Sequence, residues 1–306
     1  MKIKKLLSAA FVALFVFSGA QAQDLNEATE LYNGAVTALQ SKDYKTSLTN
    51  MQKAMEIAQA AGDEGAQMVT DCKNLIPTLI MQVAKQEIAA GNFDAALASA
   101  QDALAKATEY NNAEGIEDAK QLVPQVYTAQ GQSLLKVGNA AGAVEALSKA
   151  VEIAPENGVA NLVLGQSYQK LGKEAEAVAA FEKAAANGQE KNANKLLQNI
   201  YIQKMVAAYK GKKNADAVEA AAKALSYGEN PNAYKIGGMA AASAGKNDQA
   251  IEWLEKAKAD ASVNYNLARA YEAKGNNAKA CSYYKLIVAD KNFGQYADAK
   301  VKALCK

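Results

Sequence analysis

The chain has 306 residues, of which 50% are hydrophobic, and it carries 34 basic residues, 32 acidic residues and no histidine. This length and this apolar content exclude a disordered polymer and are sufficient for a large buried core. Because histidine is absent, the chain cannot form a Ser-His-Asp or Cys-His nucleophile pair, and it lacks the histidine ligands of common zinc sites. Acid–base chemistry by carboxylate, lysine or tyrosine side chains remains open.

The first 22 residues have the pattern of a secretory signal peptide. Three lysines precede an apolar run from Leu6 to Phe17, and Ala20 and Ala22 form the −3 and −1 positions of a cleavage site. The run is about twelve residues long, whereas a membrane span needs roughly 20. We therefore expect cleavage after Ala22, no membrane insertion of the mature chain, and a periplasmic, secreted or cell-surface location. A membrane anchor is the alternative.

The charge balance of the mature chain differs from that of the full sequence. Removal of Lys2, Lys4 and Lys5 from the 34 basic residues leaves 31 against 32 acidic residues, a net charge near −1. Lysines and acidic residues are interspersed along the chain, so there is no long-range attraction toward polyanions. The composition therefore predicts no nucleic-acid partner and no binding to anionic lipid.

A short pattern recurs seven times between residues 42 and 287. A turn residue is followed five residues later by a small residue, nine residues later by a usually larger one, and twelve residues later by another apolar residue. The turn residues of the seven copies are Lys42, Gly91, Gly138, Gly172, Lys212, Gly245 and Gly275. Repetition at one internal spacing predicts a stacked repeat architecture.

A second amphipathic stretch precedes each turn and is clearest at residues 161–172. There Leu164, Gly165, Tyr168 and Leu171 fall at helical spacing and are expected to share one face. Each unit is therefore predicted to be a helix, a short turn and a second helix. Glycine in the first helix and alanine in the second let the two backbones cross closely.

These residues resemble the tetratricopeptide repeat. The best match is residues 158–187, where the family's pattern is met by Leu164, Gly165, Tyr168, Ala177, Phe181 and Ala184. The resemblance covers nearly all of the mature chain. It implies an all-α fold, a right-handed superhelix (α-solenoid) of about seven helix pairs with a C-terminal capping helix.

The repeat spacing is irregular and divides the chain into segments. These are the signal peptide at 1–22, longer-period repeats at 23–157, repeats with a period near 34 residues at 158–290, and the capping helix at 291–306. In the longer-period part, helical spacing continues up to each internal proline, which predicts first helices extended backward with kinks at Pro77 and Pro124. Pro231 follows Asn230, a good N-cap residue, and is expected in the first turn of a helix.

Two of the three cysteines lie on either side of the last predicted turn. If the helix before the turn and the capping helix are antiparallel, residues equidistant from Phe293 should meet, and Cys281 and Cys305 are both twelve residues from it. We therefore predict a disulfide between them, which an exported location permits. Two buried thiols are the alternative. Cys72 is expected to be buried in an extended first helix.

The resemblance also implies where a partner binds. In this family the first helices line the inner surface of the superhelix and form a groove for an extended peptide or a partner helix. The predicted groove residues are Gln166, Gln169, Ile202, Gln203, Tyr209, Lys235, Met239, Tyr265, Asn266 and Arg269. The amide and aromatic side chains of this set suit hydrogen bonding to a peptide backbone more than capture of a highly charged ligand.

The family's carboxylate clamp, in which lysine, asparagine and arginine side chains of successive first helices grip a C-terminal carboxylate, is only partly present. Lys235 and Asn266 occupy clamp-like positions, but Met239 stands where an asparagine is needed. Arg269, the only arginine, can hold a carboxylate through two hydrogen bonds; a solvated surface residue is the alternative. Trp253 is expected to pack between helices rather than to bind a sugar.

The sequence favours a non-enzymatic, exported scaffold that binds another protein or a peptide through this groove. It contains neither a GxxxxGK[ST] phosphate-binding loop nor a dinucleotide-binding fingerprint, and no cofactor or metal is expected. A glycan- or small-ligand-binding protein of the cell envelope is the alternative function, and a carboxylate-dependent hydrolase is a third. The oligomeric state is left open.

Overall fold

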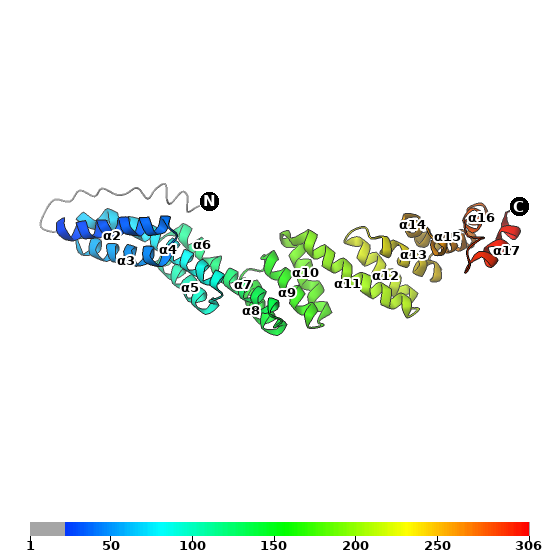
Figure 1. The fold of residues 1–306 in the computed structure, drawn as a ribbon, viewed down its shortest axis with the longest axis horizontal. Helices are drawn as coiled ribbons and strands as arrows, with labels where there is room; N and C mark the ends of the chain where they lie inside the picture. The colour runs from blue at the N-terminus through cyan, green and yellow to red at the C-terminus, as the bar shows by residue number, and fades with distance from the viewer. Residues whose placement is uncertain (1–21, 306) are drawn as a thin grey trace. The chain divides into compact units, whose positions relative to one another are not determined.

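The computed structural model of the chain describes residues 22–305, which form helices and turns and no strand (Figure 1). The predicted signal peptide lies outside these residues, except for Ala22 at the start of α2. The helices are α2 (Ala22–Gln40), α3 (Tyr44–Ala60), η1 (Gly62–Gly65), α4 (Ala66–Ala90), α5 (Phe93–Glu109), α6 (Ala113–Lys120), α7 (Leu122–Lys136), α8 (Ala140–Ile153), α9 (Gly158–Lys170), α10 (Glu174–Ala184), η2 (Ala185–Gln189), α11 (Glu190–Lys210), α12 (Asn214–Ser226), α13 (Pro231–Ser243), α14 (Asn247–Lys256), α15 (Ala261–Ala273), α16 (Asn277–Lys285) and α17 (Gly294–Leu304).

Contacts between residues group the chain into two compact units, unit 1 up to Ala177 and unit 2 from Val178. The division falls inside α10. It concerns spatial contacts, whereas the change of repeat period after residue 157 concerns spacing along the sequence.

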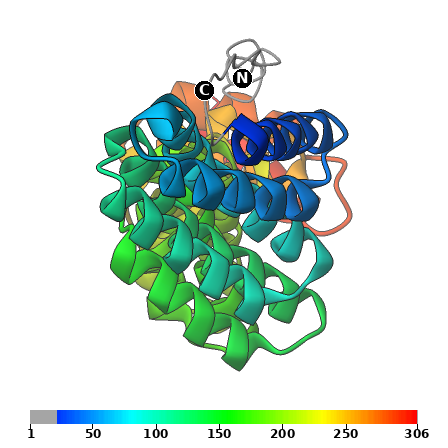
Figure 2. The ribbon, with the colours of Figure 1, turned by 90° about the vertical axis from the view of Figure 1, so that its left-hand side faces the viewer.

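Consecutive helices form pairs joined by short turns. In unit 1, α2 packs on α3, α4 on α5 and α7 on α8; in unit 2, α11 packs on α12, α13 on α14 and α15 on α16. The second helix of a pair also contacts the first helix of the next, as α3 does with α4 and α12 with α13. Figure 2 shows α2 lying beside α3. With α9 and α10, joined by the same kind of turn, the described residues contain the seven predicted helix pairs, followed by α17.

Side-chain caps determine where many of these helices begin. Each capping residue accepts a hydrogen bond from a backbone N–H two or three residues later, which satisfies a donor that has no partner within the helix. The capping residues are Asp43, Asn112, Asn139, Asn157, Asn230, Asp260 and Asn276. The predicted N-cap at Asn230 and the first-turn position of Pro231 are confirmed.

The positions that recur in the second helices form the core of the stack. Of the 21 residues five, nine and twelve positions after the seven turn residues, twenty are at most 2% exposed. The exception is Ala257, which is half-buried and follows the last residue of α14. Alanine predominates at these positions because helix axes can approach closely only where side chains are small.

Glycines in the first helices mark the closest crossings. A Cβ atom added to Gly131 of α7 would lie 2.4 Å from Cγ of Leu147, which is fully buried in α8. A Cβ atom on Gly238 of α13 would lie 2.6 Å from Cγ of Leu254 in α14. The two glycines occupy the same repeat position, so the same crossing recurs in both units.

The turns keep one backbone conformation even where glycine is missing. Gly91, Gly172 and Gly245 have φ of 79°, 71° and 73°, in the left-handed region. Lys42 and Lys212, which replace glycine in two copies, have φ of 61° and 58°. The turn is therefore set by the packing of its two helices and not by the identity of its residue, at a conformational cost of roughly 1 kcal/mol for each lysine.

The predicted backward extension of the first helix is confirmed for α4, which continues through Pro77 as one helix of 25 residues. Other details differ from the prediction. In the third copy, however, the helix is interrupted at Gln121, so Pro124 lies in the first turn of α7, where its missing N–H removes no intrahelical bond. Leu171 was expected on the packed face of its helix, but it lies at the C-cap of α9 and is 42% exposed.

Replacement of Gly131 by alanine is expected to destabilise unit 1 by about 1 to 3 kcal/mol, because the new methyl group overlaps a leucine that is packed on all sides. Gly34→Ala is the matched control. Its Cβ atom would approach nothing closer than 3.4 Å, so it should stabilise α2 by about 0.5 to 1 kcal/mol. Urea denaturation followed by circular dichroism measures both changes, and equal effects of the two substitutions would contradict the close crossing.

Candidate functional site

The first helices of unit 2 form a continuous layer, because α11 contacts α13 and α13 contacts α15. Eight of the ten predicted groove residues lie on these helices. They are Ile202, Gln203 and Tyr209 on α11, Lys235 and Met239 on α13, and Tyr265, Asn266 and Arg269 on α15. Gln166 and Gln169 lie on α9, in unit 1, where the first is half-buried and the second exposed.

Six of these eight residues are half-buried and two are exposed. Ile202, Tyr209 and Met239 are half-buried and pack against the core of unit 2. Gln203 and Arg269 are exposed. A layer of this kind offers apolar side chains whose accessible parts can be covered by a ligand, with polar groups beside them for hydrogen bonds.

Lys235 forms an ion pair with Asp260, the N-cap of α15. Oδ1 of Asp260 also accepts hydrogen bonds from Oγ of Ser262, at 2.7 Å, and from the backbone N–H of Val263, at 2.9 Å. Burial alone raises the pKa of the Asp260 carboxyl, but these donors and the positive charge of Lys235 outweigh it and hold the pKa well below its usual value. Lys235 therefore joins α13 to the start of α15.

Tyr265 is covered on one side by the C-terminal segment. Its ring stacks on that of Phe293 with centroids 4.5 Å apart, and Tyr296 of α17 meets it edge-on at 5.6 Å. The guanidinium of Arg269 lies 5.6 Å from the centroid of the Tyr265 ring. Nδ2 of Asn266 donates to the carbonyl of Ser262, 2.8 Å away, within the same helix. The structure thus brings Tyr265 and Arg269 together on α15, the first helix of the last pair.

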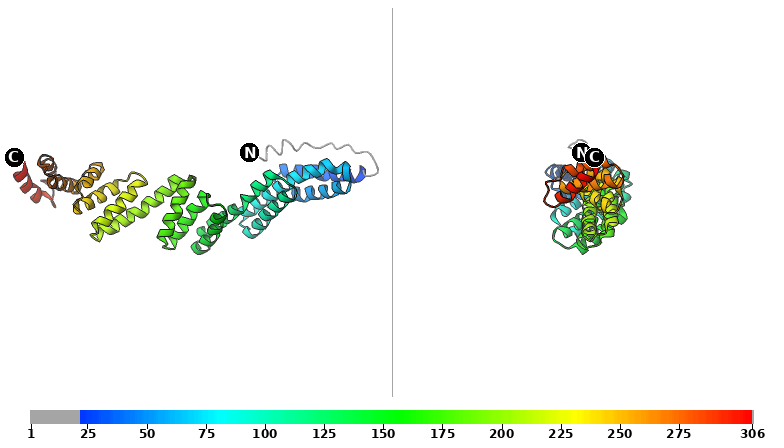
Figure 3. Two further views of the ribbon diagram at one scale, coloured as in Figure 1. Left: turned by 180° about the vertical axis from the view of Figure 1, so that it is seen from behind. Right: turned by 90° about the vertical axis from the view of Figure 1, so that its right-hand side faces the viewer.

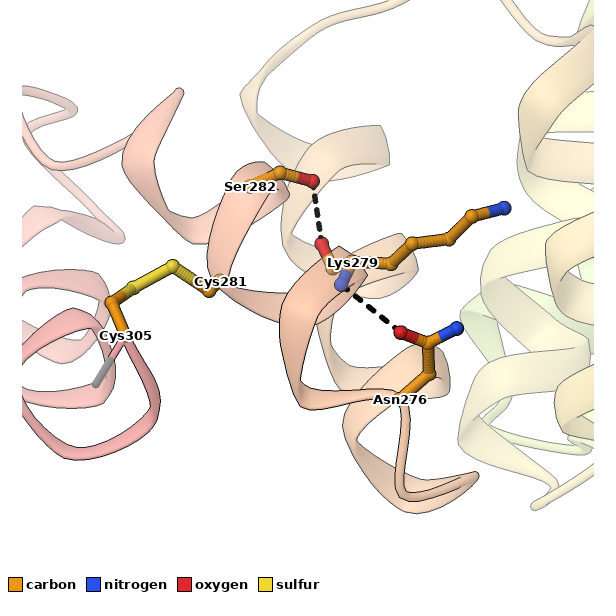
Figure 4. The surroundings of a disulfide bond; sticks show 5 residues. All are labelled: Asn276, Lys279, Cys281, Ser282 and Cys305. Atoms are coloured by element: carbon orange, nitrogen blue, oxygen red, sulfur yellow. Dashed lines mark hydrogen bonds between the residues drawn. A yellow bond between two sulfur atoms is a disulfide. The ribbon is translucent and has the colours of Figure 1, made fainter.

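The closing helix α17 is held on α15 and α16 by a network of polar and covalent contacts. Lys300 forms an ion pair with Glu272 of α15, and the hydroxyl of Tyr284 donates to the same carboxylate at 2.8 Å. A disulfide joins Cys281 of α16 to Cys305, with Cα atoms 5.5 Å apart (Figure 4). This is the predicted pair. Closure of a loop with a sequence separation of 24 contributes about 3 kcal/mol in the chain-entropy model. Figure 3 shows α16 and α17 next to one another at the C-terminus.

Cys72 and Trp253 lie in packing positions, as expected. Cys72 of α4 is fully buried, and its sulfur lies 3.4 Å from the sulfur of Met51 in α3. Burial and, to a lesser extent, the charge of Asp71 raise the pKa of its thiol to about 12, so the reactive thiolate is strongly disfavoured. Trp253 is 6% exposed and faces Gly237, whose Cβ atom would lie 3.0 Å from the indole ring.

The sequence did not indicate a cavity of about 340 Å³ between α11 and α12. Tyr201, Lys204, Ala208, Asp216, Glu219, Ala220 and Lys223 line it. The ring of Tyr201 stacks on Tyr227 with centroids 5.9 Å apart, and the Tyr227 hydroxyl donates to Glu182 at 3.1 Å. Burial and this carboxylate raise the pKa of Tyr227 to about 12. Tyr201 lies in the same helix, two residues before the predicted Gln203, and is not among the predicted groove residues.

Among the described residues, neither a metal-binding group of side chains nor a helix able to span a membrane is present. Between residues 22 and 305, no three side chains of cysteine, aspartate or glutamate are grouped so that they could hold a metal ion. Over the same stretch, no helix combines the length and the apolar character that crossing a membrane requires.

Comparison with protein families identifies the repeat. Three models described as tetratricopeptide repeat match residues 134–200, 205–264 and 261–289. The chain is a tetratricopeptide repeat protein. The helix pairs α2–α3 and α4–α5, which precede these matches, bury small residues at the same positions as the pairs within them.

Solved structures of tetratricopeptide repeat proteins also align with the chain. A protein from Parabacteroides merdae is 12% identical over 92% of this chain and 100% of its own, with a TM-score of 0.32. YrrB, described as having an unusual peptide-binding site, is 22% identical over 61% of this chain and 96% of its own, with a TM-score of 0.35. The TPR2AB domain of yeast Sti1, in complex with pHSP90, is 16% identical over 92% and 99%, with a TM-score of 0.39. Curated proteins gave no match.

At pH 7, Lys235→Met should weaken the attachment of α15 by no more than about 1 kcal/mol, because the ion pair is partly exposed. The pKa of Asp260 is lowered on folding. The charged carboxylate therefore adds its full stabilisation above the unfolded-state pKa, near 3.9, and this stabilisation is lost as the pH falls from there toward the lower folded-state pKa. The stability difference between wild type and Lys235→Met should therefore shrink below about pH 4.

Carboxyl carbon NMR of Asp260 gives a second measure of this contact. Its pKa should rise in Lys235→Met and stay unchanged in Lys258→Met, which alters an exposed lysine in the same turn. A pKa that is the same in both variants would show that Lys235 does not hold the carboxylate.

Proposed function

We propose that this chain is a non-enzymatic, exported scaffold that binds another protein or a peptide on the surface formed by α11, α13 and α15. The observation that carries this proposal is the layer of side chains on these three helices. Ile202, Tyr209 and Met239 keep part of their apolar surface accessible, while Gln203 and Arg269 stand exposed beside them. The second helices, by contrast, use their repeat positions for packing.

The chemistry of this surface favours an extended peptide over a compact charged ligand. Gln203 carries both a donor and an acceptor, which match the alternating groups of a peptide backbone. Lys235 is already paired with Asp260, so its charge is partly neutralised. Arg269 lies against Tyr265 and can orient its guanidinium toward a carboxylate of the ligand. The family is generally associated with protein interaction, which agrees with this assignment.

Export is supported by the N-terminal sequence and by the cysteines. Residues 1–22 have the charge, apolar run and small residues of a signal peptide. The pairing of Cys281 with Cys305 is the form that an oxidising compartment maintains. Cys72 is shielded from pairing by its burial.

Peptide binding is tested by panning a random peptide library against the purified chain and measuring the affinity of the enriched peptides. Gln203→Ala and Arg269→Ala, which change exposed residues, should each weaken binding at least about fivefold, as expected for residues at the centre of an interface. Lys258→Ala should leave it unchanged, because Lys258 lies in the turn before α15. Failure to enrich any peptide, or equal effects of all three substitutions, would count against this surface.

Mass spectrometry of the chain recovered from cell envelopes tests export and the disulfide together. The N-terminal peptide should begin at Gln23, and a non-reduced digest should contain a linked peptide with Cys281 and Cys305. Retention of residues 1–22 would contradict export with cleavage, and free thiols at both positions would contradict the pairing.

A further inference from the structure

The charged residues are distributed unevenly between the first helix pair and the C-terminal segment that begins within α16. Residues 24–64 carry seven acidic side chains and three lysines, whereas residues 279–306 carry six lysines and two aspartates. Because the total charge of the chain is close to zero, this opposition does not appear in the composition. Unit 1 and unit 2 therefore each contain a surface of one predominant sign.

The acidic surface surrounds a cavity between α2 and α3. Its volume is about 310 Å³, and it is lined by Asp24, Glu27, Glu56, Ile57, Ala60 and Ala61. The three carboxylates are exposed, and none of the ion pairs found among residues 22–305 includes them. We call these six residues the acidic surface. It combines three carboxylates, which form no ion pair among the described residues, with a small cavity whose other lining residues are apolar.

The basic surface lies at the turn between α16 and α17. Leu286 is 67% exposed, and Val288 and Tyr296 are each 43% exposed. Lys285 and Lys291 are exposed on either side of the first two, and no ion pair within the described chain includes either lysine. We call these five residues the basic surface. It combines unneutralised positive charge with projecting apolar side chains.

Leu286 departs from the repeat in a way that points to a partner. It lies eleven residues after the turn residue Gly275, and the equivalent positions of the four preceding copies are Lys149, Lys183, Lys223 and Lys256. The last unit of a repeat stack needs a polar outer face for solubility. An exposed leucine at the position where the four preceding copies carry an exposed lysine is therefore not expected of a capping unit. Exposed apolar groups of this kind mark interaction sites.

We propose that the chain associates head to tail with a second copy of itself, and that the basic surface of one copy docks on the acidic surface of the next. Leu286 and Val288 pack against Ile57 and the neighbouring alanines, while Lys285 and Lys291 pair with the carboxylates. The two surfaces are complementary to each other and not to themselves, so the contact is heterologous and further copies can add. This contact does not depend on peptide binding by α11, α13 and α15.

The contact should be weak and sensitive to salt. Each surface presents only a few side chains, which places it among small transient interfaces, with association expected at about 10 μM to 1 mM chain. Its charges are exposed, so raising the ionic strength from 0.1 M to 1 M shortens their range from about 10 Å to about 3 Å.

Sedimentation velocity of the mature chain between about 5 μM and about 1 mM tests the proposal. The weight-average sedimentation coefficient should rise with concentration at 0.05 M salt and rise much less at 0.5 M. The base-reversed variant, Lys285→Glu with Lys291→Glu, and the acid-reversed variant, Asp24→Lys with Glu27→Lys and Glu56→Lys, should each remain monomeric. Leu286→Ser should weaken association at least about tenfold.

Mixing the two reversed variants tests directly whether association depends on surfaces of opposite charge. The acid-reversed variant keeps the original basic surface, which fits the original acidic surface of the base-reversed variant. The two altered surfaces are also opposite in charge to each other, so the mixture should associate. The double substitution Lys195→Glu with Lys258→Glu makes the same change in net charge at exposed positions outside both surfaces, and it should associate like the wild type. Circular dichroism confirms that each variant is folded.

Three results would overturn the proposal. The first is a wild-type chain that stays monomeric up to 1 mM at low salt. The second is association that persists unchanged in the base-reversed variant, which would place the contact elsewhere. The third is a mixture of the two reversed variants that remains monomeric, because surfaces of opposite charge would then have met without associating.

Discussion

The close crossing of two helices within each pair is the contact on which the rest of the structure depends. It requires small residues on both sides, such as Gly131 against α8 and the alanines of the second helices. Where two backbones approach this closely, larger residues such as Leu147 and Leu254 fill the remaining space and exclude water. The turn conformation, the spacing of the repeat and the burial of alanine all follow from this crossing.

As a consequence of this arrangement, the two helices of a pair have different roles. The apolar residues of the second helices pack on both neighbouring helices, so few of their side chains are available to a ligand. The first helices pack through one stripe and leave the rest of their surface to other residues, such as Gln203 and Arg269 on α11 and α15. The surface that meets a partner can therefore change from repeat to repeat without disturbing the stack.

The fold could be predicted from the sequence because its decisive contacts repeat at a fixed spacing. The pattern located all seven helix pairs, including those whose turns carry Lys42 and Lys212 in place of glycine, and pairing by symmetry about Phe293 located the disulfide. The interruption at Gln121 was missed, because proline in the first turn of a helix and proline inside one look alike in a single sequence.

The candidate site was less predictable, for a different reason. The repeat pattern indicates which residues of a first helix face a ligand. It does not indicate which of these side chains are already in contact with another segment of the chain. The stacking of Phe293 on Tyr265 and the pairing of Lys235 with Asp260 depend on neighbouring segments that the pattern does not describe. The opposite charges of residues 24–64 and residues 279–306 were hidden for a similar reason, because a net charge is a sum over the whole chain.

The burial of Cys72 bears on the order in which the chain acquires its structure. A protein with three cysteines can form three different disulfides, and only one of them joins α16 to α17. Because helices here contact mainly their neighbours in sequence, α3 and α4 can pack as soon as both have left the ribosome, before Cys281 and Cys305 follow. The thiol that lacks a partner is then already enclosed beside Met51. The position of the odd cysteine near the N-terminus thus favours correct disulfide formation through timing as well as through geometry.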